Sequence, residues 1–184
     1  MIPLKSVIAM TGASGAIYGI RLLQELPGEK ILVMSKTAKA IIPEETQYSV
    51  EQVEKMADAV YDDEDFFAPI ASGSFDYDIL YVIPCTESSV AKFACGLGDN
   101  LISRTFMCAL KEQRKIVLVT RETPKSAIML ENELKLARLG VVIMDANPGF
   151  YPKPQTVGEM VDFVVGRCIS QAGIKQHLFK PWGE

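Results

Sequence analysis

The chain contains one histidine, His177, so a metal site or proton relay built from several histidines of one chain is excluded. Its cysteines, Cys85, Cys95, Cys108 and Cys168, form no CxxC pair, which argues against a zinc ribbon or a thioredoxin-like motif. We expect these thiols to be free and mostly buried, as in a protein of the reducing cytosol. His177 is expected to be a surface or interface residue.

The sequence also lacks an excess of positive charge and any long apolar run. With 19 basic and 23 acidic residues the formal net charge is −4, which argues against binding nucleic acid through overall charge. No segment approaches the roughly 20 apolar residues that cross a membrane, and the first residues reach Gly12 and Ser14 too early for a signal peptide. A hydrophobic content of 48% excludes disorder. We therefore predict a cytoplasmic globular protein that binds neither membranes nor nucleic acid.

Short apolar segments alternate with longer amphipathic ones, which is typical of a parallel sheet covered by helices on both faces. Strands are predicted at residues 6–10, 30–34, 78–83, 115–119 and 141–144. Helices are predicted at residues 16–26, 37–42, 49–56, 100–110, 126–139 and 156–171, with one more beginning near residue 86. Pro43 is expected to interrupt the second helix or to begin a new turn. We expect residues 1–184 to form one α/β domain, in which residues 174–184 are a tail that docks at the active site or at a subunit interface.

The carboxyl ends of the predicted strands carry polar or glycine-rich turns, and open parallel sheets bind their ligands there. The first turn is TGASGA (residues 11–16), where glycines permit close backbone approach and the following helix N-terminus favours an anion. The others are SK (35–36), PCTESS (84–89), TRE (120–122) and DANPGFY (145–151). Together they point to a phosphate-bearing cofactor, with simple helix capping as the alternative. A generic NAD-binding domain is disfavoured because Ser14 breaks GxGxxG and no ribose-binding acidic residue follows the second strand.

These turns belong to longer motifs that carry a resemblance to a known family. In the family's order the chain has TGASGAIYGIRLL, the Ser35-Lys36 turn, APIASGS, PCT, LGDNLISR, LKEQRKIVLVTRETP, LENELKLARLG, ANPGFY, QTVGEMVDFVVGR and PWGE. Over nearly its whole length it resembles the flavin prenyltransferases, the UbiX-like proteins. The resemblance implies a three-layer, Rossmann-like (flavodoxin-like) flavoprotein fold.

The resemblance also implies an activity, namely transfer of a dimethylallyl group from dimethylallyl (mono)phosphate to N5 and C6 of reduced FMN. The product, prenylated FMN, serves a UbiD-type decarboxylase. A homo-oligomer is implied as well, a dodecamer in which each active site lies at a junction of subunits. The sequence leaves open whether the donor is a monophosphate or a diphosphate, which decarboxylase is served, and whether the pathway is ubiquinone synthesis or aromatic-acid breakdown.

Site residues follow from the resemblance, position by position. The implied FMN-binding residues are Gly12, Ala13, Ser14, Ser35, Thr86, Glu87, Ser88, Ser89 and Arg121. The implied prenyl-phosphate residues are Lys111, Arg121, Glu122, Tyr151 and Arg167. Glu45 matches the family's active-site glutamate, and Trp182 matches its tail tryptophan. Because a carboxylate repels a flavin phosphate, we expect Glu87 to point away into solvent.

The implied reaction gives these residues roles. Loss of the phosphate leaves an anion and an allylic cation, so charge must be stabilised as it develops. The acidic segment 62–65 is not a metal-binding DDxxD motif, since Phe66 replaces the last aspartate, and we predict a solvated loop there. Without a metal, the cations Lys111, Arg121 and Arg167 hold the phosphate.

The remaining assignments concern the allylic cation and the proton. Tyr151 and Trp182 offer ring faces to the cation. We assign Glu45 to the proton transfer that closes the new ring, and Glu122 to phosphate contact. Ser14 orients flavin N5 or relays a proton. The predicted catalytic set is Ser14, Glu45, Lys111, Glu122 and Trp182, with no metal.

Two other functions remain as alternatives. Flavin-dependent decarboxylases of the cysteine-decarboxylase type share the fold, but they carry an active-site histidine and a PxMNxxMW-like segment, where this chain has ANPGFY. A non-catalytic FMN-binding subunit of a decarboxylase would not need the predicted set of carboxylates and cations.

Overall fold

The computed structural model describes residues 4–183; residues 1–3, and Glu184 at the end of the predicted tail, lie outside the described part. One parallel six-stranded sheet has the order β3-β2-β1-β4-β5-β6. Its strands are β1 (Lys5–Met10), β2 (Glu29–Met34), β3 (Ala59–Asp62), β4 (Ile79–Cys85), β5 (Lys115–Thr120) and β6 (Val142–Asp145). Because the order reverses between β1 and β4, a crevice forms beyond the carboxyl ends of these strands.

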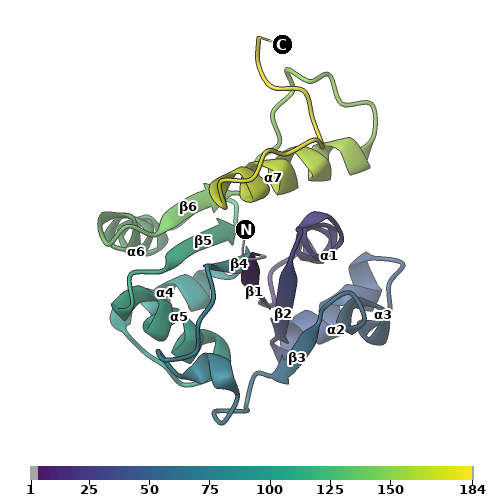
Figure 1. Cartoon of the computed structure of the whole chain (residues 1–184). Helices are drawn as coiled ribbons and strands as arrows, with labels where there is room; N and C mark the ends of the chain where they lie inside the picture. Colours follow the sequence, from purple (N-terminus) through teal and green to yellow (C-terminus); the bar gives the residue numbers. More distant parts are fainter. Residues whose placement is uncertain (1–3, 184) are drawn as a thin grey trace.

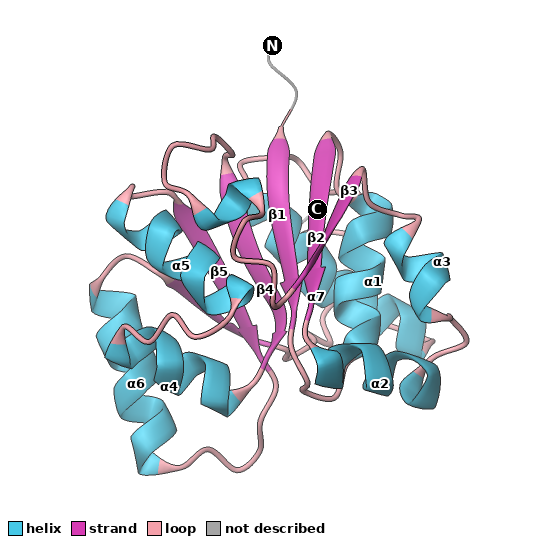
Figure 2. Cartoon of the chain, turned by 90° about the horizontal axis from the view of Figure 1, so that it is seen from below, coloured by secondary structure: helices cyan, strands magenta, loops and turns pink. Residues whose placement is uncertain are grey.

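The helices form a layer on each face of the sheet (Figure 1, Figure 2). On one face lie α1 (Ala16–Glu25), α2 (Lys36–Glu45), α3 (Val50–Glu54) and α7 (Val157–Gln171). On the other lie α4 (Glu87–Cys95), α5 (Leu101–Lys111) and α6 (Ala127–Arg138), with a 3-10 turn η1 at Pro69–Ala71. Alternate residues of β1 enter the two cores, Val7 and Ala9 one, Ile8 and Met10 the other. The predicted three-layer, Rossmann-like (flavodoxin-like) fold is confirmed.

Local signals in the sequence predict most of the helices and strands, but the structure differs from the prediction at α2 and at β3. The expected interruption at Pro43 is wrong, because Pro43 lies in the last turn of α2, which ends two residues later at Glu45. Proline removes only the one hydrogen bond that an N–H at position 43 would donate to Lys39 O, and the helix continues past it for two residues. The edge strand β3 is absent from the prediction because its residues, AVYD, are only alternately half-buried and form no continuous apolar run.

The acidic segment 62–65 differs from a wholly solvated loop at Asp63. Its carboxylate accepts hydrogen bonds from Asn100 Nδ2 at 2.8 Å and from the backbone N–H of Ile102 at 2.9 Å. Burial raises the pKa of Asp63, against the lowering effect of these hydrogen bonds. Asp63 therefore acts as a cap that fixes the start of α5.

The chain after α7 folds back along that helix (Figure 1). The Gln176 side chain accepts from the N–H of Leu178 at 2.7 Å and of Phe179 at 3.1 Å, and it donates to Phe179 O at 2.9 Å. Phe179 packs on Phe163 of α7, with ring centroids 4.6 Å apart. Within residues 4–183, no helix combines the length and apolar character needed to span a bilayer.

Candidate functional site

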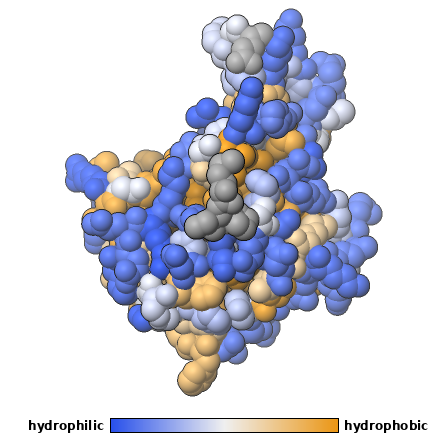
Figure 3. Space-filling model, in the orientation of Figure 1, coloured by the Kyte–Doolittle hydropathy of each residue, from blue (hydrophilic) through white to orange (hydrophobic). Residues whose placement is uncertain are grey.

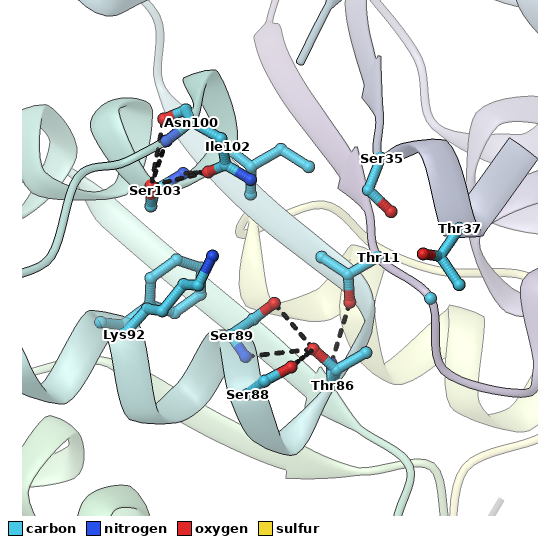
Figure 4. A pocket seen from close by; sticks show the side chains of 12 residues that line it. Thr11, Ser35, Thr37, Thr86, Ser88, Ser89, Lys92, Asn100, Ile102 and Ser103 are labelled. Atoms are coloured by element: carbon cyan, nitrogen blue, oxygen red, sulfur yellow. Dashed lines mark hydrogen bonds between the residues drawn. The ribbon is translucent and has the colours of Figure 1, made fainter. Parts of the chain in front are cut away.

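A cavity of about 280 Å³ opens at the carboxyl ends of β1, β2 and β4, at the reversal of strand order (Figure 4). Hydroxyl side chains form much of its wall, and Lys92 adds a positive charge. The lining residues are Thr11, Gly12, Ser35, Thr37, Thr86, Ser88, Ser89, Lys92, Phe93, Asn100, Ile102 and Ser103. Several predicted FMN-binding residues are among them, namely Gly12, Ser35, Thr86, Ser88 and Ser89.

Thr86 organises the hydroxyl groups on one side of this cavity (Figure 4). As the N-cap of α4, its Oγ1 accepts from Ser89 N–H at 3.1 Å and lies 3.1 Å from Ser88 Oγ and 2.8 Å from Ser89 Oγ. Its N–H donates to Thr11 Oγ1 at 2.9 Å, and that hydroxyl donates to Pro84 O at 2.8 Å. The hydroxyls and the helix N-terminus together form a surface suited to an anion.

Gly12 and Ser35 form the facing wall. Ser35 is the N-cap of α2, and its hydroxyl accepts from Ala38 N–H at 3.1 Å. A Cβ atom at position 12 would lie 2.5 Å from Thr37 Cγ2, so only glycine lets the β1–α1 loop approach α2 this closely.

Lys92, Asn100 and Ser103 line the cavity but were not predicted from the sequence. Lys92 follows Ser88 by four residues and so shares its side of α4. Its ammonium donates to both carboxylate oxygens of Asp99, at 3.0 and 2.9 Å. Asn100 and Ser103 form a reciprocal capping box at the start of α5. The i, i+4 spacing from Ser88 is a signal that would have identified Lys92.

Glu45, Ser14 and Arg121 meet beside the cavity. The Glu45 carboxylate, at the end of α2, accepts from Gly15 N–H at 2.7 Å and from Ala16 N–H at 3.3 Å. It thereby caps α1, whose own N-cap, Gly15, has no side chain. Arg121 Nε donates to Ser14 O at 3.2 Å. Three predicted site residues, from the β1–α1 loop, the end of α2 and the loop after β5, are thus brought together.

The charge state of Glu45 follows from these contacts. Partial burial raises the pKa of Glu45, but hydrogen bonds from Ser14, Gly15 and Ala16 and the charge of Arg121 bring it below its ordinary value. Glu45 is therefore ionised at neutral pH, which makes it an acceptor of protons rather than a donor.

A second cavity, of about 300 Å³, opens beyond β5 and β6. Its lining residues are Thr120, Arg121, Glu122, Thr123, Lys125, Asp145, Ala146 and Asn147. The exposed Glu122 carboxylate accepts from Thr123 N–H at 3.0 Å. Arg121 lines this cavity and also contacts the β1–α1 loop, in which Gly12 lines the first cavity.

Tyr151 and Trp182 lie outside α7, in an aromatic cluster that packs on Phe163 of this helix. Tyr151 makes T-shaped ring contacts with Trp182, at a centroid distance of 5.4 Å, and with Phe163, at 5.5 Å. Arg167 lies on the exposed side of α7, next to Gly166, where a Cβ atom would lie 2.8 Å from Phe179. The tail thus holds Trp182 against a predicted phosphate-binding residue.

Lys111 stands apart from the other predicted phosphate residues. It ends α5 just before β5 begins, whereas Arg121 follows the end of β5. The strand spans about 20 Å at roughly 3.3 Å per residue, and Lys111 forms an ion pair with the neighbouring Glu112. One chain therefore does not bring its own Lys111 to its own Arg121.

Charge repulsion predicts that Glu87 points into solvent, but its carboxylate binds a neighbouring helix instead. The Ser126 hydroxyl at the start of α6 donates to Glu87 Oε1 at 2.7 Å, so Glu87 joins α4 to α6. It is absent from the cavity wall, as are Ala13, Ser14 and Arg121. In the described part of the chain, no cluster of three or more His, Cys, Asp or Glu residues is arranged to hold a metal ion.

Comparison with known proteins identifies relatives over the whole fold. The Flavoprotein family model matches residues 3–169. Flavin prenyltransferase UbiX of Methanocaldococcus jannaschii is 43% identical over 182 residues, which are 98% of this chain and 99% of the relative.

Two solved structures superpose closely. AnUbiX (PadA1), in complex with FMN and dimethylallyl pyrophosphate, has a TM-score of 0.96 and 42% identity, and the match covers 98% of each chain. A dodecameric FMN-dependent UbiX-like decarboxylase from Escherichia coli O157:H7 has a TM-score of 0.96 and 43% identity, covering 98% of this chain and all (100%) of that one.

Proposed function

Because the chain belongs to the UbiX flavin prenyltransferases within the flavoprotein family, we propose that it transfers a dimethylallyl group from dimethylallyl phosphate to N5 and C6 of reduced FMN. The observation that carries this function is the hydroxyl-lined cavity at the sheet's reversal point, together with a second cavity whose lining residue Arg121 contacts the β1–α1 loop. A flavin and a prenyl phosphate need two such neighbouring sites.

The residues of the first cavity fit FMN. Thr86, Ser88 and Ser89 present hydroxyls at the N-terminus of α4, which suits a phosphate. Gly12 leaves open the space that a side chain would close. When bound and reduced, FMN supplies the nucleophilic atoms that accept the dimethylallyl group.

The chain's own residues then hold the donor and move the proton. Arg121 binds the donor's phosphate, with Arg167, Tyr151 and Glu122 completing the contacts. Positive charge placed there stabilises the phosphate as it leaves. Glu45, ionised and hydrogen-bonded to the β1–α1 loop, accepts the proton released when the new ring closes, and Ser14 orients the acceptor beside it. Trp182 shields the allylic cation together with Tyr151.

The position of Lys111 supports an active site shared between copies of the chain. Since Lys111 cannot reach its own Arg121, the phosphate receives the lysine of a neighbouring subunit in a homo-oligomer, a dodecamer. Large apolar side chains are exposed on α6, where Figure 3 shows hydrophobic surface at the left, and near β3. They include Ile128, Leu130, Leu134 and Phe67, the last 99% exposed. Such exposed apolar surface is typical of protein interfaces.

The wider role of the protein follows from its product. Prenylated FMN serves a UbiD-type decarboxylase, and the enzyme works in the cytoplasm. The tail, residues 174–184, docks at the active site or at a subunit interface and brings Trp182 to Tyr151.

The test is anaerobic incubation of the protein with reduced FMN and dimethylallyl monophosphate, or diphosphate, followed by mass spectrometry. We expect a flavin heavier by one prenyl unit, formed much more slowly by the variant Glu45→Gln. Glu44→Gln, a change at the exposed neighbouring residue, is the matched control. Unchanged flavin with both donors would refute the function, and normal turnover by Glu45→Gln would refute the proton transfer.

A further inference from the structure

A cluster of polar and charged side chains lies in the wall of the second cavity, which three of its four members line, and it has no role in the reaction so far described. Lys125 Nζ lies 2.8 and 3.1 Å from the two carboxylate oxygens of Glu133, and it also contacts Asp145. The Thr120 hydroxyl donates to Glu133 Oε1 at 3.1 Å and lies 3.3 Å from Lys125 Nζ. We call Thr120, Lys125, Glu133 and Asp145 the Lys125 cluster.

Stability alone does not account for this cluster. The side chains of Lys125 and Glu133 are only 16% and 9% exposed. Removing such charges from water costs as much as, or more than, their attraction returns, and well-packed apolar residues serve a core at least equally well. Glu133 shares its side of α6 with Met129 and Leu136, both fully buried, where an apolar residue is the ordinary choice. The ion pair therefore calls for a reason other than core packing.

The position of the cluster supplies that reason. Thr120 and Lys125 flank the segment 121–124, which carries Arg121 and Glu122, so their contact closes the base of this loop. Asp145 ends β6 and begins the loop that leads to Tyr151. One ammonium group thus joins the bases of both loops that bear predicted phosphate-binding residues. The N–H groups of the Lys125 ammonium donate hydrogen bonds in particular directions, whereas an apolar contact at the same place has no preferred direction.

We propose that Lys125 and Glu133 are positioning residues that hold Arg121 and Glu122 in the arrangement that binds the prenyl donor's phosphate. The proposal rests on the proposed function for the identity of the ligand. It assigns neither residue a contact with the substrate or with FMN.

The test compares the variants Lys125→Met and Lys125→Met/Glu133→Met with wild type. In the double variant an apolar pair replaces the ion pair, so we expect its melting temperature and FMN dissociation constant to stay close to wild type. We expect its KM for dimethylallyl phosphate to rise about tenfold, because small misplacements of binding groups weaken productive contacts steeply. The single variant leaves Glu133 buried without its partner and should lose stability as well. Lys135→Met, which removes an exposed lysine from α6, the helix that carries Glu133, is the control and should change none of these quantities.

Calorimetric titration of the FMN-loaded protein with dimethylallyl phosphate measures the donor's dissociation constant without turnover. Failure of the proposed function is recognised by a different result, the absence of prenylated flavin when the wild type is assayed. A double variant that binds the donor within twofold of wild type would overturn the positioning role. So would a loss of donor affinity matched by equal losses of FMN affinity and thermal stability, since that pattern indicates general disruption. If the wild type binds no donor, the positioning role fails together with the proposed function.

Discussion

The variant Gly12→Ala tests whether the cavity beside the β1–α1 loop holds the flavin. A Cβ atom built at Gly12 lies 2.5 Å from Thr37 Cγ2 and 2.6 Å from Thr37 Cβ. Since carbon atoms in contact are about 3.5–4.0 Å apart, Thr37 must move by about 1 Å. Thr37 is exposed at the start of α2 and lines the cavity, so its side chain has room to move there only while the cavity is empty.

The expected magnitude follows from that difference between the empty and the occupied cavity. Forcing an extra methyl group into a packed site costs about 1–3 kcal/mol. If most of that cost applies to the flavin-bound protein, the FMN dissociation constant rises about tenfold, at roughly 1.4 kcal/mol per factor of ten. Rotation of the Thr37 side chain moves Cγ2 but not Cβ, so in the free protein the exposed start of α2 must also shift away from the β1–α1 loop. The open cavity leaves room for that shift, so the melting temperature should fall by less than the loss of FMN affinity implies.

Titration of the apoprotein with FMN, followed by quenching of flavin fluorescence, measures this constant. Adding Thr37→Gly to Gly12→Ala removes both atoms that the new methyl group meets and should restore most of the affinity. Gly98→Ala is the control, because its Cβ atom would make only an ordinary contact of 3.7 Å with Arg104. The reasoning fails if Gly12→Ala binds FMN within twofold of wild type, or if Thr37→Gly restores nothing.

Three further predictions concern pH, thiol reactivity and assembly. The pKa of Glu45 is lowered on folding, so its contribution to stability is present above the unfolded pKa and is lost as pH falls through the folded pKa. The melting temperatures of wild type and Glu45→Gln should therefore differ most near neutral pH and converge in acid; a difference independent of pH would contradict this. In the native protein, a thiol reagent such as Ellman's reagent should label Cys95 alone, because the other thiols are buried and burial raises the pKa of Cys168 to about 12; rapid labelling of more than one thiol would contradict it. The protected thiols are Cys85, Cys108 and Cys168. Finally, co-expression of the inactive variants Lys111→Ala and Arg121→Ala should regain about a quarter of wild-type activity, since random assortment of subunits gives that share of sites with both side chains intact; absence of any recovery would place both residues in one subunit's site.

Sequence patterns predict the interior strands and the helix starts because local physics determines both. The strand β4 is buried along its whole length and reads as an apolar run, and the capping boxes at Ser49 and Thr156 occur where the sequence predicts them. The strand β3 shows the limit of this approach. It pairs with β2 at the sheet's edge, and partners distant in the sequence, rather than its own residues, make it a strand.

The same limit applies to the site. Residues at strand ends, such as Ser35 and Thr86, are predictable because the topology of a parallel sheet brings these ends together. Lys92 enters the cavity from the second turn of α4, and Asp63 caps a helix far along the chain, so both depend on packing between elements. Lys111 was recognised by its motif, but its distance from Arg121 appears only once β5 is seen to separate them.

Helix capping and anion binding, which the sequence presents as alternatives, are compatible at these strand ends. A serine or threonine hydroxyl has two acceptor lone pairs and one donor proton. Capping uses an acceptor, as in the bonds from Ala38 N–H to Ser35 and from Ser89 N–H to Thr86. Capping therefore does not use the proton, which can turn to a phosphate; at Thr86 it does so in exchange for a bond with the neighbouring Ser88 or Ser89 hydroxyl. The capped helix holds the oxygen in place for that bond. Hydroxyl N-caps at the carboxyl ends of β2 and β4 therefore both stabilise the fold and prepare an anion site. Replacing Thr86 with aspartate, an equally good cap that lacks the donor proton and adds negative charge, should keep α4 intact and abolish FMN binding; unchanged FMN affinity in that variant would show that capping is the only role of this hydroxyl.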